Sequence, residues 1–104
     1  MKEENFEITE NTDDKICNFV AKGRIDANSS NILLFKLENA LKREPKKIIL
    51  NMAQVEYLSS IGIRAILQIY KQAAKASCRF NIESPSEIVK NVLGMVALNQ
   101  LIAK

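Results

Sequence analysis

The chain has 104 residues, of which 47% are hydrophobic and 26% are charged, with a net charge of +3. This balance predicts one globular domain over residues 1–104 and excludes a disordered chain. No apolar run is long enough to span a bilayer, and the N-terminus is too polar for a signal peptide, so we expect a cytoplasmic protein without membrane insertion.

The composition also removes several kinds of chemistry. There is no histidine, which excludes a Ser-His-Asp triad and a histidine-ligated zinc site. The two cysteines, Cys17 and Cys78, are too few for a four-cysteine metal site. Each lies in an apolar, strand-like segment, so we expect two buried, free thiols and no metal.

The N-terminal part predicts a β-hairpin. Apolar residues alternate around Phe6 and Ile8 and again over residues 16–21. A turn-forming run at 11–14 separates the two segments, and Gly23 ends the second one.

A helix and a buried strand follow. Residues 26–31 are rich in helix-capping types and are followed by apolar residues at helical spacing up to Leu41. The continuous run Ile48, Ile49 and Leu50 then predicts a central strand. We expect helices to cover both of its faces, so that all three side chains are more than half buried.

The second half alternates between helices and a strand. After a short linker at 53–59, the pattern predicts a helix over Ser60–Lys75, a strand over Cys78–Glu83, a helix over 84–93 and a short final helix over 97–102. The fold class is therefore α/β: a mixed four- to five-stranded sheet, at least partly parallel, with about four helices packed on it.

Basic residues cluster at 42–47, between the first helix and the central strand. Nucleic-acid binding is the functional interpretation of such a cluster. A solvated turn is the simpler one, and we favour it because no aromatic residue lies beside the cluster to stack on bases. We therefore expect no direct contact with nucleic acid.

The segment most informative about function is the turn Ser59-Ser60-Ile61-Gly62, where the chain enters the second helix. A helix N-terminus offers free N–H groups and favours anions, including a phosphate carried on the protein itself. Serines also commonly cap helices, and Gly62 could serve close packing instead. An enzyme with a serine nucleophile would need a base, and no Ser-x-x-Lys occurs at this turn; we expect no enzymatic activity.

The segment resembles the signature of the STAS family, the sulfate-transporter and anti-sigma-factor-antagonist domain, and the element order of nearly the whole chain is similar. The matching positions are Met52, Val55, Leu58, Ser60, Gly62 and Ile63. The stretch Gly23–Asp26 resembles the turn that precedes the family's first helix. Asn51 and Ser59 stand where the signature has Asp, Ala53 where it has Ser, and Ile61 where it has Ser or Thr.

The resemblance implies an anti-sigma-factor antagonist without a cofactor. In that family, the unmodified antagonist binds an anti-sigma factor that is also a serine kinase. Phosphorylation of the turn serine ends the binding, and a protein phosphatase restores it. Here the implied acceptor is Ser60, with Ser59 as the alternative. The implied partner-binding residues are Gly23, Asp26, Ser59, Ile61 and Gly62.

We also expect Gly62, Ile61 and parts of the Gly23–Asp26 turn to form one exposed patch beside Ser60, because both turns precede helices on the same sheet. Two other functions stay open. One is a STAS scaffold or transport accessory subunit that does not switch. The other is a module that binds a small ligand or nucleotide at the helix N-terminus.

Overall fold

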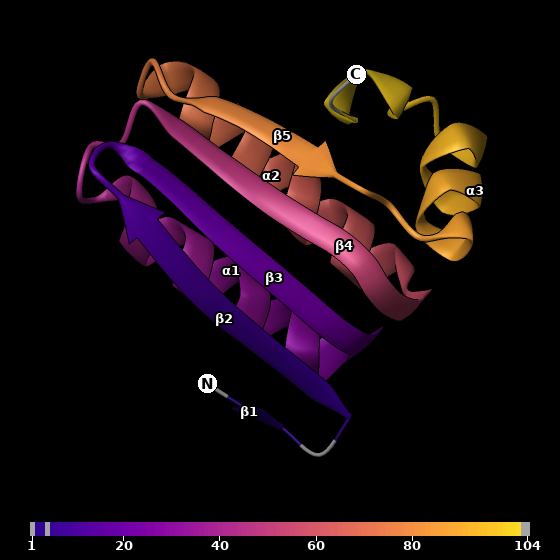
Figure 1. Ribbon diagram of the computed structural model, residues 1–104. Coiled ribbons are helices and arrows are strands. Elements are labelled where there is room, and N and C mark those ends of the chain that lie inside the picture. The colour runs from indigo at the N-terminus through magenta and orange to yellow at the C-terminus, as the bar shows by residue number, and fades with distance from the viewer. Residues whose placement is uncertain (1, 4, 103–104) are drawn as a thin grey trace.

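The computed structural model describes residues 2, 3 and 5–102, which form one five-stranded sheet, three α-helices and a 3-10 helix (Figure 1). The expected fold class is confirmed. The elements are β1 (Lys2–Glu3), β2 (Phe6–Asp13), β3 (Ile16–Ile25), α1 (Ala27–Leu41), β4 (Lys47–Leu58), α2 (Ser60–Lys75), β5 (Arg79–Glu83), α3 (Glu87–Met95) and η1 (Asn99–Leu101).

The strands lie in the sheet in chain order, β1-β2-β3-β4-β5. The hairpin of β2 and β3 is antiparallel, and β4 pairs in parallel with β3 and with β5. The two crossovers through α1 and α2 therefore build the expected parallel part of the sheet.

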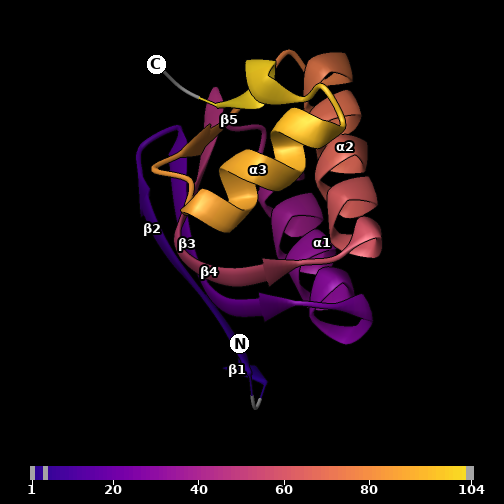
Figure 2. The same cartoon turned by 90° about the vertical axis from the view of Figure 1, so that its right-hand side faces the viewer.

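Helices α1 and α2 lie on one face of the sheet, and no helix covers the other face within the part of the chain that the structure describes (Figure 2). The expectation that helices cover both faces is wrong. Both crossovers step across the sheet in the same direction, and because β-α-β crossovers are right-handed, both helices fall on the same side. Helix α3 packs against β4, and the N–H of Ser86, its N-cap, donates to the Met52 carbonyl of that strand at 3.1 Å.

Strand β4 is longer than expected. Residues 53–58 continue it instead of forming a linker, and they pair with the end of β3 up to Ile25↔Leu58. The register between the two strands shifts twice in this stretch, each time leaving an extra residue on β4. Such bulges bend a strand, and in Figure 2 the ends of β3 and β4 curve toward the helices. The bulges also change the spacing of buried residues from two positions before Met52 to three positions after it. Because this part of β4 lacks the alternation typical of a strand, the sequence pattern did not predict it.

Other boundaries differ by a few residues. Strand β2 continues through Asp13, so the hairpin turn lies at residues 14–15 instead of 11–14. Helix α3 runs past Gly94 to Met95, and the expected last helix is only the 3-10 turn η1. Helix α2 has the predicted bounds, Ser60–Lys75. No helix among the described residues is long and apolar enough to cross a membrane.

The core lies between the helical face of the sheet and α1, α2 and α3. Ile48 and Leu50 are fully buried there, and the expected burial of both cysteines is confirmed. Burial raises the pKa of the Cys78 thiol. Ile49 points to the open face between Asn18 and Asn81 of the neighbouring strands and is partly buried, so the expectation that all three side chains are more than half buried is confirmed.

The two faces of β4 predict different costs of truncation. Ile48→Ala should lower the free energy of unfolding by about 2–5 kcal/mol, because it leaves a cavity in the core. Ile49→Ala should cost roughly 1 kcal/mol, since it mainly removes cross-strand contacts on a solvated face. Urea denaturation of both variants tests this, and equal losses would mean that the open face is covered in solution.

Candidate functional site

The N-termini of α1 and α2 lie side by side at the carboxyl ends of β3 and β4 (Figure 2). The Ser59 N–H donates to the carbonyl of Ile25 at 2.9 Å, which ties the start of α2 to the end of β3. The two expected functional segments, which are more than thirty residues apart in the chain, therefore meet at one end of the molecule.

The two serines at the start of α2 have different roles. Ser59 is the N-cap: its backbone is extended, and its Oγ accepts a hydrogen bond from the Gly62 N–H at 3.0 Å. Ser60 is the first helical residue and is exposed, and no side-chain hydrogen bond of Ser60 is found among the described residues. Its hydroxyl therefore faces solvent, while that of Ser59 caps the helix.

The start of α1 is closed by its own cap. The Asp26 carboxylate accepts the Ser29 N–H at 3.0 Å, and the Asp26 N–H donates to Ser29 Oγ at 2.8 Å. The hydrogen bond from the Ser29 N–H holds the pKa of Asp26 below its usual value. Asp26 therefore presents a carboxylate beside the serine turn that is fixed in place by its own helix.

Gly62 is not on the surface. The expectation of an exposed patch is wrong for this residue, because it is buried where α2 meets α1. A Cβ built on Gly62 would lie 2.8 Å from both Ile25 Cγ2 and Leu58 Cδ1. Ser30 Oγ would be 3.3 Å away. A side chain at this position has no room without moving its neighbours.

Gly23 is also buried, so it too falls outside the exposed patch. Its φ is +102°, and a Cβ there would lie 2.1 Å from the Asn5 carbonyl oxygen. The next residue, Arg24, donates its N–H to that same carbonyl at 2.8 Å. Gly23 therefore lets the chain entering β2 approach β3 closely, as only glycine can.

The side chains that do face solvent around Ser60 are larger ones. Ile61 is 44% exposed, as expected. Tyr57 is 39% exposed, and the Arg24 guanidinium lies 4.3 Å from the centre of its ring. Sequence analysis missed Arg24 and Tyr57, because they are 33 positions apart and only the bulged register of β3 and β4 pairs them. Tyrosine and arginine are enriched among the residues that contribute most to binding at protein interfaces.

The first turn of α2 combines an exposed hydroxyl with a helix N-terminus. The described residues contain no group of three or more side chains that could hold a metal ion. At the first turn of α2, the Gly62 N–H goes to the cap and the Ile63 N–H goes to the Ser59 carbonyl. Ser60 is the first residue of α2 and so stands at the end of the helix that carries a partial positive charge.

An α/β domain with an exposed serine at a helix N-terminus is the class that fold and site define. A family model described as "STAS domain" matches residues 6–104, and the chain belongs to this family.

Solved structures with the same fold include anti-sigma factor antagonists. The antagonist SpoIIAA in its unphosphorylated form superposes with a TM-score of 0.83, covering 93% of this chain and 86% of that chain at 16% identity. An anti-sigma factor antagonist from Mycobacterium paratuberculosis gives 0.82, with 93% and 82% covered at 14% identity. The Bacillus SpoIIAA in its phosphorylated form gives 0.76, with 93% and 89% covered at 15% identity.

The cap predicts unequal effects of two neighbouring substitutions. Ser59→Ala should lower the free energy of unfolding by about 1 kcal/mol, because the Gly62 N–H loses its acceptor. Ser60→Ala should change it by less than about 0.5 kcal/mol, since the hydroxyl is exposed. Chemical denaturation of the two variants measures both. The opposite ranking would mean that Ser60 is the cap.

The burial of Gly62 predicts that it serves the fold. Gly62→Ala should cost about 1–3 kcal/mol through overpacking, and Gly62→Arg should fail to fold. Gly94→Ala is the matched control, because a Cβ there meets only Asn99 Oδ1 at 3.6 Å, and it should stabilise α3 by roughly 0.5–1 kcal/mol. Thermal unfolding of both alanine variants checks the prediction, which an unchanged melting temperature for Gly62→Ala would contradict.

Proposed function

We propose that this protein is an anti-sigma-factor antagonist whose affinity for its partner is switched by phosphorylation of Ser60. The observation that carries the proposal is the exposed, unengaged Ser60 hydroxyl at the first position of α2, in a domain of the STAS family. Similar structures named as anti-sigma factor antagonists support it, one of them solved both with and without phosphate.

The choice of Ser60 over Ser59 rests on their hydrogen bonds. A phosphate on Ser59 Oγ would disturb the acceptor that holds the Gly62 N–H. A phosphate on Ser60 would extend into solvent from a helix N-terminus, where the dipole favours negative charge by about 0.3–1 kcal/mol. Modification of Ser60 therefore leaves the fold intact.

Both missing aspartates of the family signature are compatible with this switch. Ser59 replaces one of them at the N-cap, and serine and aspartate are similarly good caps. Asn51 replaces the other, seven residues before the end of β4, and its Oδ1 accepts the Ala53 N–H at 2.9 Å. Asn51 lies in the straight part of β4, before both bulges, where it pairs with Val20 of β3 and Glu83 of β5.

The switch works because a phosphate is tolerated within the domain but not in a packed interface. A phosphoserine adds about 1.5–2 negative charges near pH 7. Covering that charge with a partner costs several kcal/mol unless a cation meets it. A change of about 1.4 kcal/mol already alters affinity tenfold.

The contact surface for the partner consists of the exposed groups around the turn. Ile61 and Tyr57 supply apolar area, and Asp26, Ser59 and Arg24 supply polar contacts. Gly23 and Gly62 are buried and contribute indirectly, because each lets neighbouring segments pack closely under this surface. The partners are an anti-sigma factor with serine kinase activity and a protein phosphatase, and the protein itself acts in the cytoplasm as a regulator without a cofactor or an enzymatic activity.

The test is phosphate incorporation from ATP by the cognate anti-sigma-factor kinase, located by mass spectrometry, together with partner affinity. The parent and Ser59→Ala should take up one phosphate, and Ser60→Ala should take up none. Ser60→Asp should bind the kinase at least about tenfold more weakly, because a carboxylate supplies part of the phosphate charge. Circular dichroism of each variant confirms folding.

Two outcomes would contradict the proposal in different ways. Phosphate on Ser59 in the Ser60→Ala variant, and none in Ser59→Ala, would move the acceptor by one residue. No phosphate on any variant, with Ser60→Asp binding like the parent, would favour a STAS scaffold or transport subunit that does not switch. Micromolar nucleotide binding to the chain alone would favour a ligand-binding module.

A further inference from the structure

A pocket lies along β5, the strand at one edge of the sheet, between this strand, the C-terminal half of α2 and the segment around η1. It has a volume of about 700 Å³ and is open to solvent. Sites for small organic ligands have volumes of about 300–1,000 Å³. The residues that give this β5-edge pocket its chemistry are Lys47, Tyr70, Ala74, Arg79, Asn81 and Ile102.

The charged side chains that line the β5-edge pocket are both cations. Lys47 and Arg79 are paired positions of β4 and β5, so their side chains leave the sheet next to each other on its open face. None of the described residues that line the pocket carries a carboxylate. The ion pairs found among residues 2, 3 and 5–102 involve neither Lys47 nor Arg79. The pocket therefore has two positive charges that no acid in it balances.

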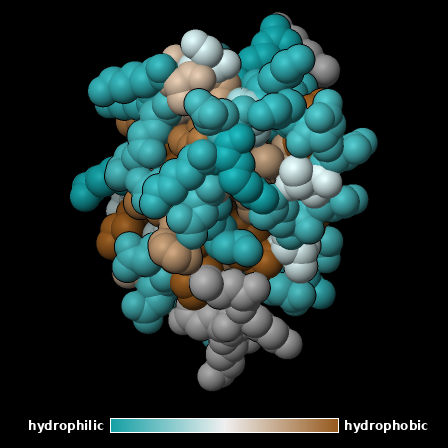
Figure 3. Space-filling model, turned by 90° about the vertical axis from the view of Figure 1, so that its left-hand side faces the viewer, coloured by the Kyte–Doolittle hydropathy of each residue, from teal (hydrophilic) through white to brown (hydrophobic). Residues whose placement is uncertain are grey.

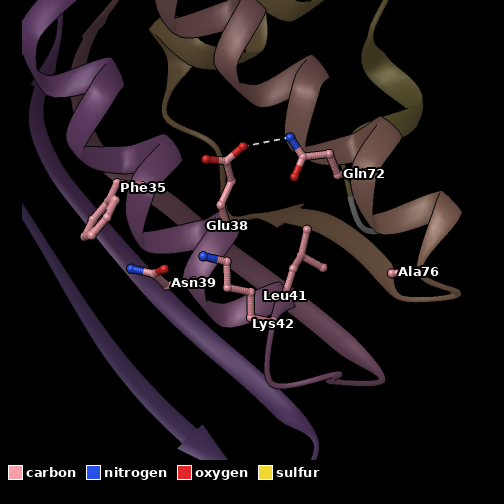
Figure 4. A pocket seen from close by; sticks show the side chains of 7 residues that line it. All are labelled: Phe35, Glu38, Asn39, Leu41, Lys42, Gln72 and Ala76. Atoms are coloured by element: carbon pink, nitrogen blue, oxygen red, sulfur yellow. Dashed lines mark hydrogen bonds between the residues drawn. The ribbon is translucent and has the colours of Figure 1, made fainter.

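Two other hollows on the surface have balanced charges. The groove between α1 and α2 is lined by Glu38 and Lys42, and Gln72 Nε2 donates to Glu38 Oε2 at 2.8 Å (Figure 4). A smaller hollow on the open face of the sheet is lined by Glu7 and Lys22, which are paired positions of β2 and β3. An acid beside a base does not select the charge of a ligand, whereas two cations without an acid favour an anion.

Hydrogen-bond donors accompany the two cations. Asn81 follows Arg79 by two positions on β5 and so faces the same side of the sheet. The Arg79 N–H donates to the Lys46 carbonyl at 3.0 Å, on the side of β4. The next N–H along the strand, that of Phe80, therefore points to the free edge of the sheet, where it is available to a ligand.

The other part of the lining is mainly apolar. Tyr70 on α2 is 37% exposed, and Ala74, one helical turn further, is exposed as well. Ile102 forms an isolated bridge with Ile82, which holds the segment after η1 beside β5. A ring, a methyl group and a branched aliphatic side chain thus lie in the same pocket as the two cations.

We propose that the β5-edge pocket binds a small amphiphilic anion, whose carboxylate or phosphate group lies beside Lys47 and Arg79. Its apolar body packs against Tyr70, Ala74 and Ile102. Hydrogen bonds from a cation to an anion are about twice as strong as neutral ones, and a guanidinium can hold a carboxylate or phosphate through two parallel bonds. The apolar groups add affinity only for a ligand that carries a hydrocarbon part.

A large protein partner fits this place less well. Figure 3 looks onto the end of the domain at which β4 and β5 begin, and hydrophilic side chains cover most of it. A protein interface needs an apolar centre that is depleted of charge. The apolar groups of the β5-edge pocket lie directly beside two cations, which suits a ligand with a charged head and a short apolar body.

The β5-edge pocket is remote from the serine turn. Tyr70 lies ten residues after Ser60 on α2, which is about 15 Å along the helix. Lys47 is the first residue of β4, and the serine turn follows the last one. The proposed ligand therefore binds at a site of its own, and not at the N-terminus of α2.

The experiment titrates the full chain with octyl phosphate and with octanoate and follows the amide shifts in NMR spectra. Octanol and octyltrimethylammonium keep the apolar chain and change the charge, whereas inorganic phosphate and acetate keep the charge and lack the chain. We expect both octyl anions to bind with a dissociation constant below about 1 mM and to shift the amides of residues 79–81 and 102. Each control compound should bind at least roughly fivefold more weakly.

Vesicles distinguish two sources of such a ligand. Vesicles of phosphatidylglycerol present an anionic headgroup, and vesicles of phosphatidylcholine are the control without net charge. Given binding of the octyl anions, binding to the anionic vesicles that is lost in Arg79→Gln supports the proposal with a lipid headgroup as the ligand. No binding to either vesicle supports it with a free acid or phosphate ester as the ligand.

Matched variants locate the binding. Arg79→Gln should weaken the binding of octyl phosphate roughly fivefold, or by about 1 kcal/mol. Lys22→Gln, which removes one positive charge elsewhere on the same face of the sheet, should weaken it less than about twofold. Ala74→Glu places a carboxylate in the pocket and should abolish the binding, whereas Gln68→Glu adds the same charge at an exposed position of α2 outside the lining and should not. Ser60→Asp should leave the binding unchanged, so that failure of the switch and failure of the pocket are separate results.

Several results would overturn the proposal. One is the absence of binding at about 1 mM of either octyl anion. Another is an equal effect of Arg79→Gln and Lys22→Gln, which would indicate attraction by net charge alone. Equally tight binding of octanol would mean that the cations do not take part. Amide shifts centred on residues 59–62 would place the anion at the serine turn instead.

Discussion

The arrangement of the whole domain depends on the direction of its two crossovers. Strands β3, β4 and β5 follow one another across the sheet in chain order, so the connections through α1 and α2 step the same way. Right-handed crossovers that step the same way place both helices on one face, with both N-termini at the same end. The single core, the open face of the sheet and the pairing of the two helix starts all follow from this geometry.

In the serine turn, Ser59 and Gly62 fix the backbone, whereas Ser60 and Ile61 face solvent. Ser59 closes the helix with its hydroxyl, and Gly62 lets α2 approach Ile25 and Ser30. Because these two residues fix the backbone, Ser60 and Ile61 can face solvent without a structural duty. A chemical change at such a position alters what the surface presents and leaves the packing beneath it unchanged, which is what a switch on a rigid scaffold requires.

The two ends of helix α2 carry partial charges of opposite sign. At the serine turn, the partial positive charge comes from backbone N–H groups that have no intrahelical partner. At the other end, the last carbonyl groups give a partial negative charge. Lys75 in the last turn of α2 offsets this negative charge and so stabilises the helix.

Sequence by itself determined the element order, the α/β class, the bounds of α2 and the place of the serine turn, because these depend on local periodicity and on capping residues. The family signature, which is also a local pattern, led to the prediction that Ser60 is the phosphate acceptor. Tertiary structure alone decided what depends on neighbours distant in the chain. Bulges against β3 extend β4 through residues expected to be a linker, and the register they set brings Arg24 onto Tyr57. Gly62 is buried because Ile25 and Ser30, from another part of the chain, occupy the space beside it. A sequence pattern indicates which apolar side chains will be buried. Whether a residue such as Gly62 is buried depends on the segments, distant in the chain, that pack against it.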